Sequence, residues 1–117
     1  MAYATQSDIT DLYSADALYV ADRDGDGTVE TEAVTRALEQ ASDEIDSYLA
    51  VRYRLPLPEV PGILRQIAVD FALYRLALSR DVLSDEHRRR YEDGRDHLKR
   101  IADGRAALHL PSLAADP

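Results

Sequence analysis

Apolar residues recur every three or four positions along most of the chain, a pattern that predicts helices separated by short breaks. The strongest periodicity runs over roughly residues 30–52, where one apolar stripe lies opposite a polar face. A second helix is expected over residues 60–79, where apolar residues nearly encircle the helix and so indicate burial on several sides. Shorter helices are expected within residues 5–21, and another long one over roughly residues 84–103. The pattern predicts an all-α fold, a small bundle of about four helices with long central helices.

Polar residues and prolines mark where these helices begin and end. Thr5 or Ser7 can cap the first helix and Ser84 the last, because their side-chain oxygens accept a bond from free backbone amides. The segment Leu55-Pro56-Leu57-Pro58 breaks the chain between the two longest helices, and its leucines are expected to tuck against the bundle. Gly104 is a plausible stop for the last helix.

The expected helix ends divide the chain into two units, a helical domain over residues 1–104 and an extended C-terminal tail over residues 105–117. The tail is apolar but lacks helical periodicity. Its Leu108, Leu110 and Leu113 have no evident place inside the bundle. They either fold back onto the bundle or dock on a partner, and the sequence favours neither alternative.

Asp70 and Arg75 interrupt the apolar pattern of residues 60–79. An unpaired carboxylate is costly to bury, so Asp70 is expected to pair with Arg52 or another arginine. No second acid or histidine is evident beside Asp70, which favours a structural role over a catalytic one.

The chain of 117 residues has a formal net charge of −8. Its first half is acidic and its final third is more basic. Acids concentrate in residues 8–46, whereas most of the clustered bases lie in residues 88–105. This asymmetry suits packing of copies head to tail, but a solvated helix face with mixed ion pairs is the favoured interpretation of the basic run. A DNA-binding protein that uses residues 88–105 is a weaker hypothesis, because the net charge repels phosphates.

Several protein classes are disfavoured by what the sequence lacks. It has no cysteine, which excludes disulfides and cysteine-based zinc sites. No apolar run approaches the ~18 residues of a membrane helix, and no signal peptide is recognised, so a soluble protein is expected. His87, His97 and His109 show no metal-ligand spacing and are expected at the surface. No catalytic motif appears, and we expect no enzyme.

Ligand chemistry is indicated by spacing at one stretch, Asp22-Arg23-Asp24-Gly25-Asp26-Gly27-Thr28-Val29-Glu30. In a calcium loop, Asp22, Asp24 and Asp26 take the first, third and fifth positions, and Gly27 makes the sharp turn. The carbonyl of Thr28 would follow at the seventh position, and Glu30 would reach the ion through water at the ninth.

The twelfth position of that loop weakens the calcium hypothesis. A bidentate glutamate is expected there, but the chain has Ala33, with Glu32 one residue early. The alternative is a polar turn in which aspartates cap backbone amides and Gly25 and Gly27 adopt positive φ. Either way, the stretch connects the first helical segment to the long second helix.

Several segments in this order resemble the Mu-like prophage family of small head–tail joining proteins. They are the opening Met-Ala-Tyr-Ala-Thr-Gln-Ser-Asp, the aspartate loop, Ala41-Ser-Asp-Glu-Ile-Asp-Ser-Tyr-Leu49, Arg52-Tyr-Arg-Leu-Pro-Leu-Pro58, Val60-Pro61, Asp70-Phe-Ala-Leu-Tyr-Arg-Leu76 and Arg90-Tyr-Glu-Asp93. The resemblance covers nearly the whole chain and loosens after Gly104.

This resemblance implies a helical head–tail connector, an adaptor that completes the head in the neck of the virion after assembly in the host cytoplasm. Such adaptors form a ring, commonly of twelve copies, between the portal protein and a stopper or tail-completion protein. DNA passes through the lumen without specific binding, which an acidic ring would favour. No catalytic residue carries over. The alternative hypothesis is a small calcium-binding helix–loop–helix module with Ca²⁺ as its ligand.

Overall fold

The computed structural model describes residues 2–21 and 29–108 of the chain. Over these ranges the protein is helical and contains no strand. In chain order the elements are α1 (Gln6–Tyr13), the 3₁₀ helix η1 (Ala15–Ala21), α2 (Thr31–Leu49), α3 (Gly62–Arg80) and α4 (Asp85–Ala102). The predicted all-α fold is confirmed, and each long helix begins and ends within a few residues of its expected range.

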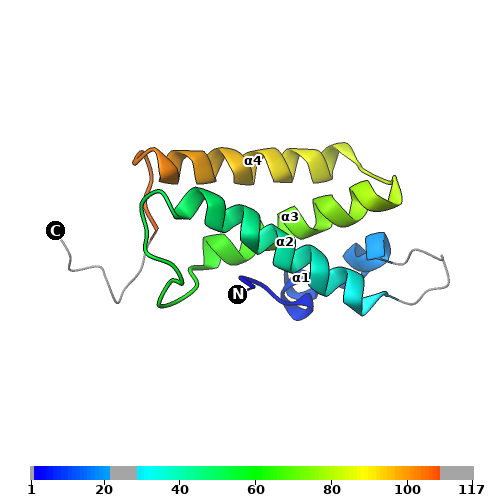
Figure 1. Cartoon of the computed structure of the whole chain (residues 1–117). Coiled ribbons are helices and arrows are strands. Elements are labelled where there is room, and N and C mark those ends of the chain that lie inside the picture. The colour runs from blue at the N-terminus through cyan, green and yellow to red at the C-terminus, as the bar shows by residue number, and fades with distance from the viewer. Residues whose placement is uncertain (1, 22–28, 109–117) are drawn as a thin grey trace.

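The centre of the bundle is α3, as the encircling apolar pattern predicts. This helix packs against α1, η1, α2 and α4. Figure 1 shows α4 lying over α2 and α3, with α1 on the far side of the bundle. Burial on several sides is visible in the buried residues of α3, which are Leu64, Ile67, Ala68, Val69, Asp70, Phe71, Ala72, Leu73, Leu76 and Ala77.

The predicted caps at Thr5 and Ser84 are present. The Thr5 N–H donates to Asp8 Oδ2 at 2.9 Å while Thr5 Oγ1 accepts from the Asp8 N–H at 3.3 Å, which completes a capping box. Ser84 Oγ accepts the His87 N–H at 3.1 Å. At the other end of α4 the chain leaves the helix through Gly104, whose φ of 84° favours glycine.

The proline segment between α2 and α3 packs against the bundle as expected. Leu57 is buried, and Leu55 is partly buried against the same core. Pro61 is the N-cap of α3 and precedes its first residue, Gly62. The segment therefore closes the end of the bundle at which α2 ends and α3 begins.

Residues 105–108 turn back onto this same end of the bundle. Leu108 is buried, and its N–H donates to the Tyr53 hydroxyl at 3.0 Å. Nearby, the Arg52 guanidinium donates to the carbonyl of Ala106 at 2.9 Å. The first predicted tail leucine thus lies in the core, whereas Leu110 and Leu113 lie outside the described residues and their docking stays a prediction.

Candidate functional site

The aspartate loop lies mostly outside the described residues. Asp22, Asp24, Asp26 and Thr28 belong to the undescribed range 22–28, so the predicted calcium site stays a prediction. The last of its residues, Glu30, is the N-cap of α2, and its N–H donates to the carbonyl of Ala21 at 3.0 Å. This bond holds together the two ends of the chain that flank the loop.

The twelfth position of the candidate loop is turned toward the core. Ala33 is buried in the first turn of α2, whereas Glu32 beside it is exposed. A long carboxylate at position 33 would therefore have to displace core packing, which gives a physical reason for the small residue there. Among residues 2–21 and 29–108, no three His, Asp or Glu side chains are grouped closely enough to hold a metal ion.

A cleft of about 360 Å³ opens between α1, α3 and α4, and we call it the α3–α4 groove. Its apolar lining includes Ile63 and Ile67 of α3 and the ring of Tyr13. The remaining lining residues are Gln66, Asp70, Arg90, Asp93, Gly94, His97 and Arg100. They recur at helical spacing along facing sides of the two helices, so the groove follows the helix pair rather than forming a round pocket.

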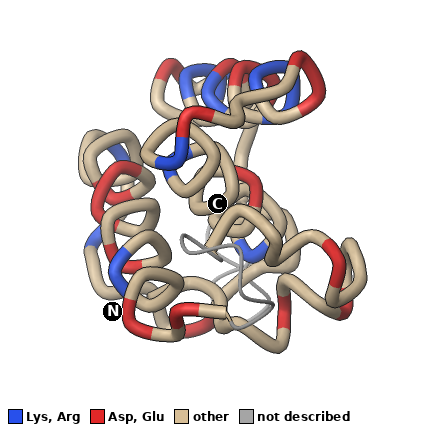
Figure 2. The backbone as a smooth tube through the Cα atoms, turned by 90° about the vertical axis from the view of Figure 1, so that its right-hand side faces the viewer, with Lys and Arg blue, Asp and Glu red and all other residues tan. Residues whose placement is uncertain are grey.

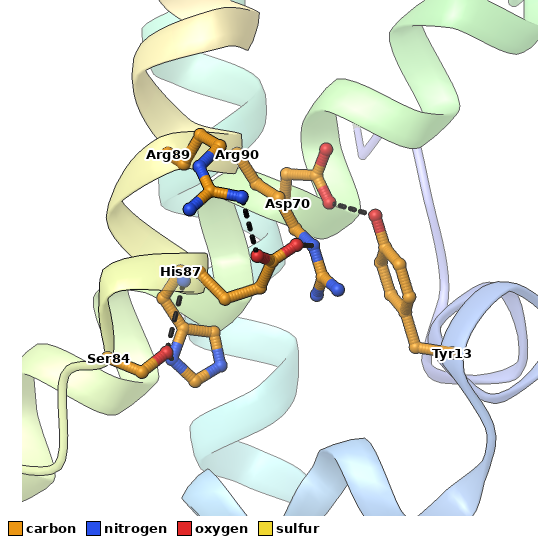
Figure 3. A network of polar contacts seen from close by, with 7 residues as sticks. Tyr13, Asp70, Ser84, His87, Arg89 and Arg90 are labelled. Atoms are coloured by element: carbon orange, nitrogen blue, oxygen red, sulfur yellow. Dashed lines mark hydrogen bonds and ion pairs between the residues drawn. The ribbon is translucent and has the colours of Figure 1, made fainter.

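Asp70 lies at one end of this groove and is buried, with 7% of its surface exposed. Its Oδ1 accepts the hydroxyl of Tyr13 at 2.6 Å (Figure 3), which links α3 to the last residue of α1. Burial raises the pKa of Asp70 to about 6, although the Tyr13 hydrogen bond and the nearby Arg90 charge both oppose this shift. Desolvation is therefore the dominant influence on this carboxyl group.

Arg90 completes the contact between α1, α3 and α4. Its guanidinium lies over the Tyr13 ring, 4.2 Å from the centroid, and its Nε donates to Glu86 Oε1 at 3.0 Å. Figure 3 shows Arg90 and Tyr13 approaching Asp70 from different helices. The arrangement fastens the short α1 to the two long helices through a cation–π contact and one partly buried hydrogen bond.

Asp70 was expected to pair with Arg52 or another arginine, and for Arg52 this expectation is wrong. Arg90 is the arginine near enough to lower the pKa of Asp70, whereas the hydrogen bond to Asp70 comes from Tyr13. Arg52 follows the end of α2, and its Nη1 donates to the carbonyls of Ile101 and Ala106 at 2.7 and 2.9 Å. The neutral partner Tyr13 was missed because α1 is short and its position against α3 depends on tertiary packing. The expectation that no second acid or histidine lies beside Asp70 is also wrong, because Asp93 and His97 of α4 line the groove with it. Asp93 and His97 are four residues apart and so share one face of α4, which is the local signal that could have suggested this cluster.

The side of α4 away from the groove is closed by contacts with side chains of α2 and α3. Glu44 of α2 accepts Arg75 Nη2 of α3 at 2.8 Å and the Tyr91 hydroxyl of α4 at 2.7 Å. The Tyr91 ring stacks on Tyr74 with 4.1 Å between centroids and contacts Phe71 at 4.8 Å. Aromatic packing and a charge-assisted network thus fill the contact among α2, α3 and α4.

The histidines are not all at the surface. His87 is buried, so that expectation is wrong for this residue, and its Nδ1 lies 2.9 Å from Ser84 Oγ at the start of α4. Burial lowers the pKa of His87. His97 is half-buried in the groove, where desolvation also lowers its pKa. His109 lies outside the described residues.

Basic and acidic residues are interspersed along α4, the top helix in Figure 2. Arg89 and Arg90 both pair with Glu86, at 3.2 and 3.0 Å. This favours the mixed ion-pair face over a continuous basic surface. No helix in the described part of the chain is long and apolar enough to cross a membrane.

Comparison with known proteins places this helical bundle in a phage family. The profile of the family described as Bacteriophage Mu, Gp36 matches residues 3–117. The Mu-like prophage FluMu protein gp36 of Haemophilus influenzae is 43% identical over 77 residues, a match that spans 66% of this chain but 53% of the relative. Gene product J of Escherichia phage Mu is 32% identical over 117 residues, or 98% of this chain and 82% of the relative. The chain belongs to the bacteriophage Mu Gp36 family.

Proposed function

We propose that this protein is a non-enzymatic head–tail adaptor of a Mu-like phage particle. In this role several copies form a ring, commonly of twelve, between the portal protein and a tail-side stopper. The observation that carries the proposal is the family match from residue 3 to residue 117 together with relatives named as Mu and Mu-like prophage products.

Physical features of the bundle support this role. The net charge of −8 favours passage of DNA through a lumen over binding to its phosphates. The long helices provide a rigid body, because α3 is buried on several sides and tied to α4 through Phe71 and Tyr91. Exposed apolar residues at the ends of the helices, such as Val51 and Leu78, offer contact surface for neighbours.

A nonsense mutation in the gene within an inducible prophage tests the proposal. We expect lysates that contain DNA-filled heads and complete but unattached tails, because the junction cannot form. Electron microscopy counts joined and unjoined particles, and a plasmid copy of the gene should restore joining. Joined, infectious particles at the parental yield in the absence of the protein would refute the adaptor role.

Calcium binding is a second candidate function, because the Glu30–Ala21 bond closes the ends of a loop with calcium-type spacing. Such a site would stabilise the folded chain in the presence of Ca²⁺. Differential scanning fluorimetry with and without millimolar Ca²⁺ measures this, and Asp24→Ala should abolish any shift. Equal melting temperatures with and without Ca²⁺ would rule out calcium-linked stabilisation.

A further inference from the structure

The α3–α4 groove has an open apolar stretch near the start of α3. Ile63, in the first turn of α3, retains 41% of its surface exposed while lining the groove, and the exposed Gln66 lines it nearby. Among the described residues that line the groove, α1 contributes only Tyr13, its last residue. A large aliphatic side chain exposed inside a concave site indicates a surface suited to further apolar contacts.

Buried side chains fix the shape of the groove where α3 and α4 approach each other. A Cβ added to Gly94 would lie 3.0 Å from Phe71 Cε1 and 3.3 Å from Ile67 Cγ2. Gly94 and Ile67 both line the groove, and both are buried. Glycine at position 94 therefore allows the two helices to pack closely, so the groove is a shaped surface of the folded chain.

The chain leaves α4 at one end of this groove. Arg100, in the last turn of α4, lines the groove, and its carbonyl accepts the N–H groups of Arg105 and Ala106 at 2.8 and 3.1 Å. Figure 1 shows the end of α4 and the start of α3 at the same end of the bundle. The chain thus turns back at a residue whose side chain lines the groove, near the end at which Ile63 is exposed.

The chain is held against its own bundle up to the last described residue. Arg52 Nη1 donates to the carbonyl of Ala106 at 2.9 Å, and the Tyr53 hydroxyl accepts the Leu108 N–H at 3.0 Å. The Leu108 side chain is 8% exposed and belongs to the hydrophobic core. Packing of the tail on its own chain therefore begins before residue 109, within a few residues of Arg100.

Nine residues follow Leu108, and their composition and length suit the groove. They read His-Leu-Pro-Ser-Leu-Ala-Ala-Asp-Pro, with two leucines at positions 110 and 113. Pro111 disfavours a helical conformation for the residue before it. Nine extended residues span about 30 Å, whereas α4 rises only about 15 Å over the ten residues from Arg90 to Arg100. Residues 109–117 are thus long enough to follow the groove from end to end.

The covalent attachment favours the groove of the same chain over that of a second copy. A short tether holds a binding segment at an effective concentration on the order of millimolar. A second copy at micromolar concentration competes with this at a large disadvantage. Because Leu108 is already fixed near one end of the groove, few residues lose freedom before Leu110 meets Ile63.

We propose that residues 109–117 fold back as a strap along the α3–α4 groove of their own chain, with Leu110 and Leu113 against Ile63 and Ile67. The strap covers the exposed aliphatic surface of the groove and continues the packing that Leu108 begins. This contact lies within one chain and does not depend on the adaptor role, so its failure would leave that role standing.

Site-specific disulfide formation tests the strap, since the natural chain has no cysteine. The double variant Gln66→Cys with Ala114→Cys keeps both tail leucines and is oxidised mildly at micromolar concentration. We expect a disulfide within the monomer, in at least tenfold higher yield than in Val51→Cys with Ala114→Cys. Val51 is a matched control because it is 69% exposed, lies outside the groove and precedes Arg52, which holds Ala106. Equal yields would overturn the strap, because a tail that is merely tethered reaches Val51 as readily.

The contribution of the leucines is tested in the chain that carries Gln66→Cys and Ala114→Cys. Adding Leu110→Ser and Leu113→Ser should lower the yield of the disulfide to the level of the Val51→Cys control, because the apolar contacts are lost. Ala115→Ser, a polar substitution in the same segment, should leave the yield unchanged. A yield that the two leucine substitutions do not lower would overturn docking through these side chains.

Mixing separate chains distinguishes the strap from binding between copies. The single variants Gln66→Cys and Ala114→Cys, each with a different tag, are oxidised together at the concentration used for the double variant. We expect the mixed dimer in less than one tenth of the yield of the disulfide within the double variant. Mixed dimers at the same yield, or a double variant linked mainly into dimers, would assign the groove to a second copy and overturn the strap.

Discussion

Two carboxylates beside α4 are held in different ways. Glu44 on one side accepts both a guanidinium and a tyrosine hydroxyl, from Arg75 and Tyr91. Asp70 on the other side is more deeply buried but accepts one hydrogen bond, from Tyr13. The first carboxylate completes a closed contact among three long helices, whereas the second lies where a short helix leaves a groove. The helices α3 and α4 thus have one side closed by side-chain contacts and one side left open as a groove.

Phe71 packs between Tyr91 on the closed side and Gly94 of the groove lining, so its truncation should have the largest effect. Its side chain is fully buried, contacts Tyr91 on the closed side and approaches Gly94 beneath the groove. We expect Phe71→Ala to lower the free energy of unfolding by about 3–5 kcal/mol through lost burial and a new cavity. Urea denaturation measures this loss, and Leu78→Ala on the exposed surface of α3 should change stability by less than about 0.5 kcal/mol.

Asp70→Asn should stabilise the protein at alkaline pH. Burial raises the pKa of Asp70 from 3.8 to about 6, so the folded chain binds more protons than the unfolded chain between these values. The contribution of this group to stability therefore falls as pH rises from 4 to 6 and stays low above that range. We expect the asparagine variant to be more stable than the parent by about 2 kcal/mol at pH 8.

The pH dependence of that difference is the diagnostic result. Urea denaturation of both proteins at pH 4, 6 and 8 should show the advantage of Asp70→Asn shrinking toward acidic pH, where Asp70 is protonated in the parent. Comparing the two proteins at each pH cancels the titration of the other carboxylates. A difference that is the same at all three pH values would contradict the account of Asp70.

Glu44→Gln should destabilise the protein, by less than Asp70→Asn stabilises it at pH 8. Removing the charge weakens the bonds from Arg75 and Tyr91, and we expect a loss of about 1 kcal/mol at neutral pH, since Arg75 is partly exposed. A double-mutant cycle with Arg75→Met measures the coupling between the two side chains. Additive effects of the two substitutions would show that the ion pair contributes nothing to the closed side.

The sequence predicted the helices well because their signals are local. The apolar stripe of α2, the encircling pattern of α3 and the caps at Thr5 and Ser84 each depend on residues within a few turns. The partner of Asp70 was not predictable in this way, since Tyr13 lies 57 positions earlier in the chain. The burial of His87 was missed for a similar reason, because it depends on η1 placing Tyr19 beside the start of α4.

The groove, too, was predictable from the sequence only in its local features. The spacing of Ile63, Ile67 and Asp70 marks one face of α3, but whether another helix covers that face depends on the length and position of α1. Aspartate spacing identified the candidate calcium loop from local sequence alone. Its twelfth position shows the limit of such motifs, because Ala33 also belongs to the core face of α2.

The central claim is that this chain is a structural adaptor at the junction of head and tail. A cryo-electron microscopy reconstruction of the neck of the phage particle tests it most directly. We predict a ring of copies between portal and tail whose subunits fit the α2–α3–α4 bundle. A resolved neck that contains no density for this bundle would contradict the claim.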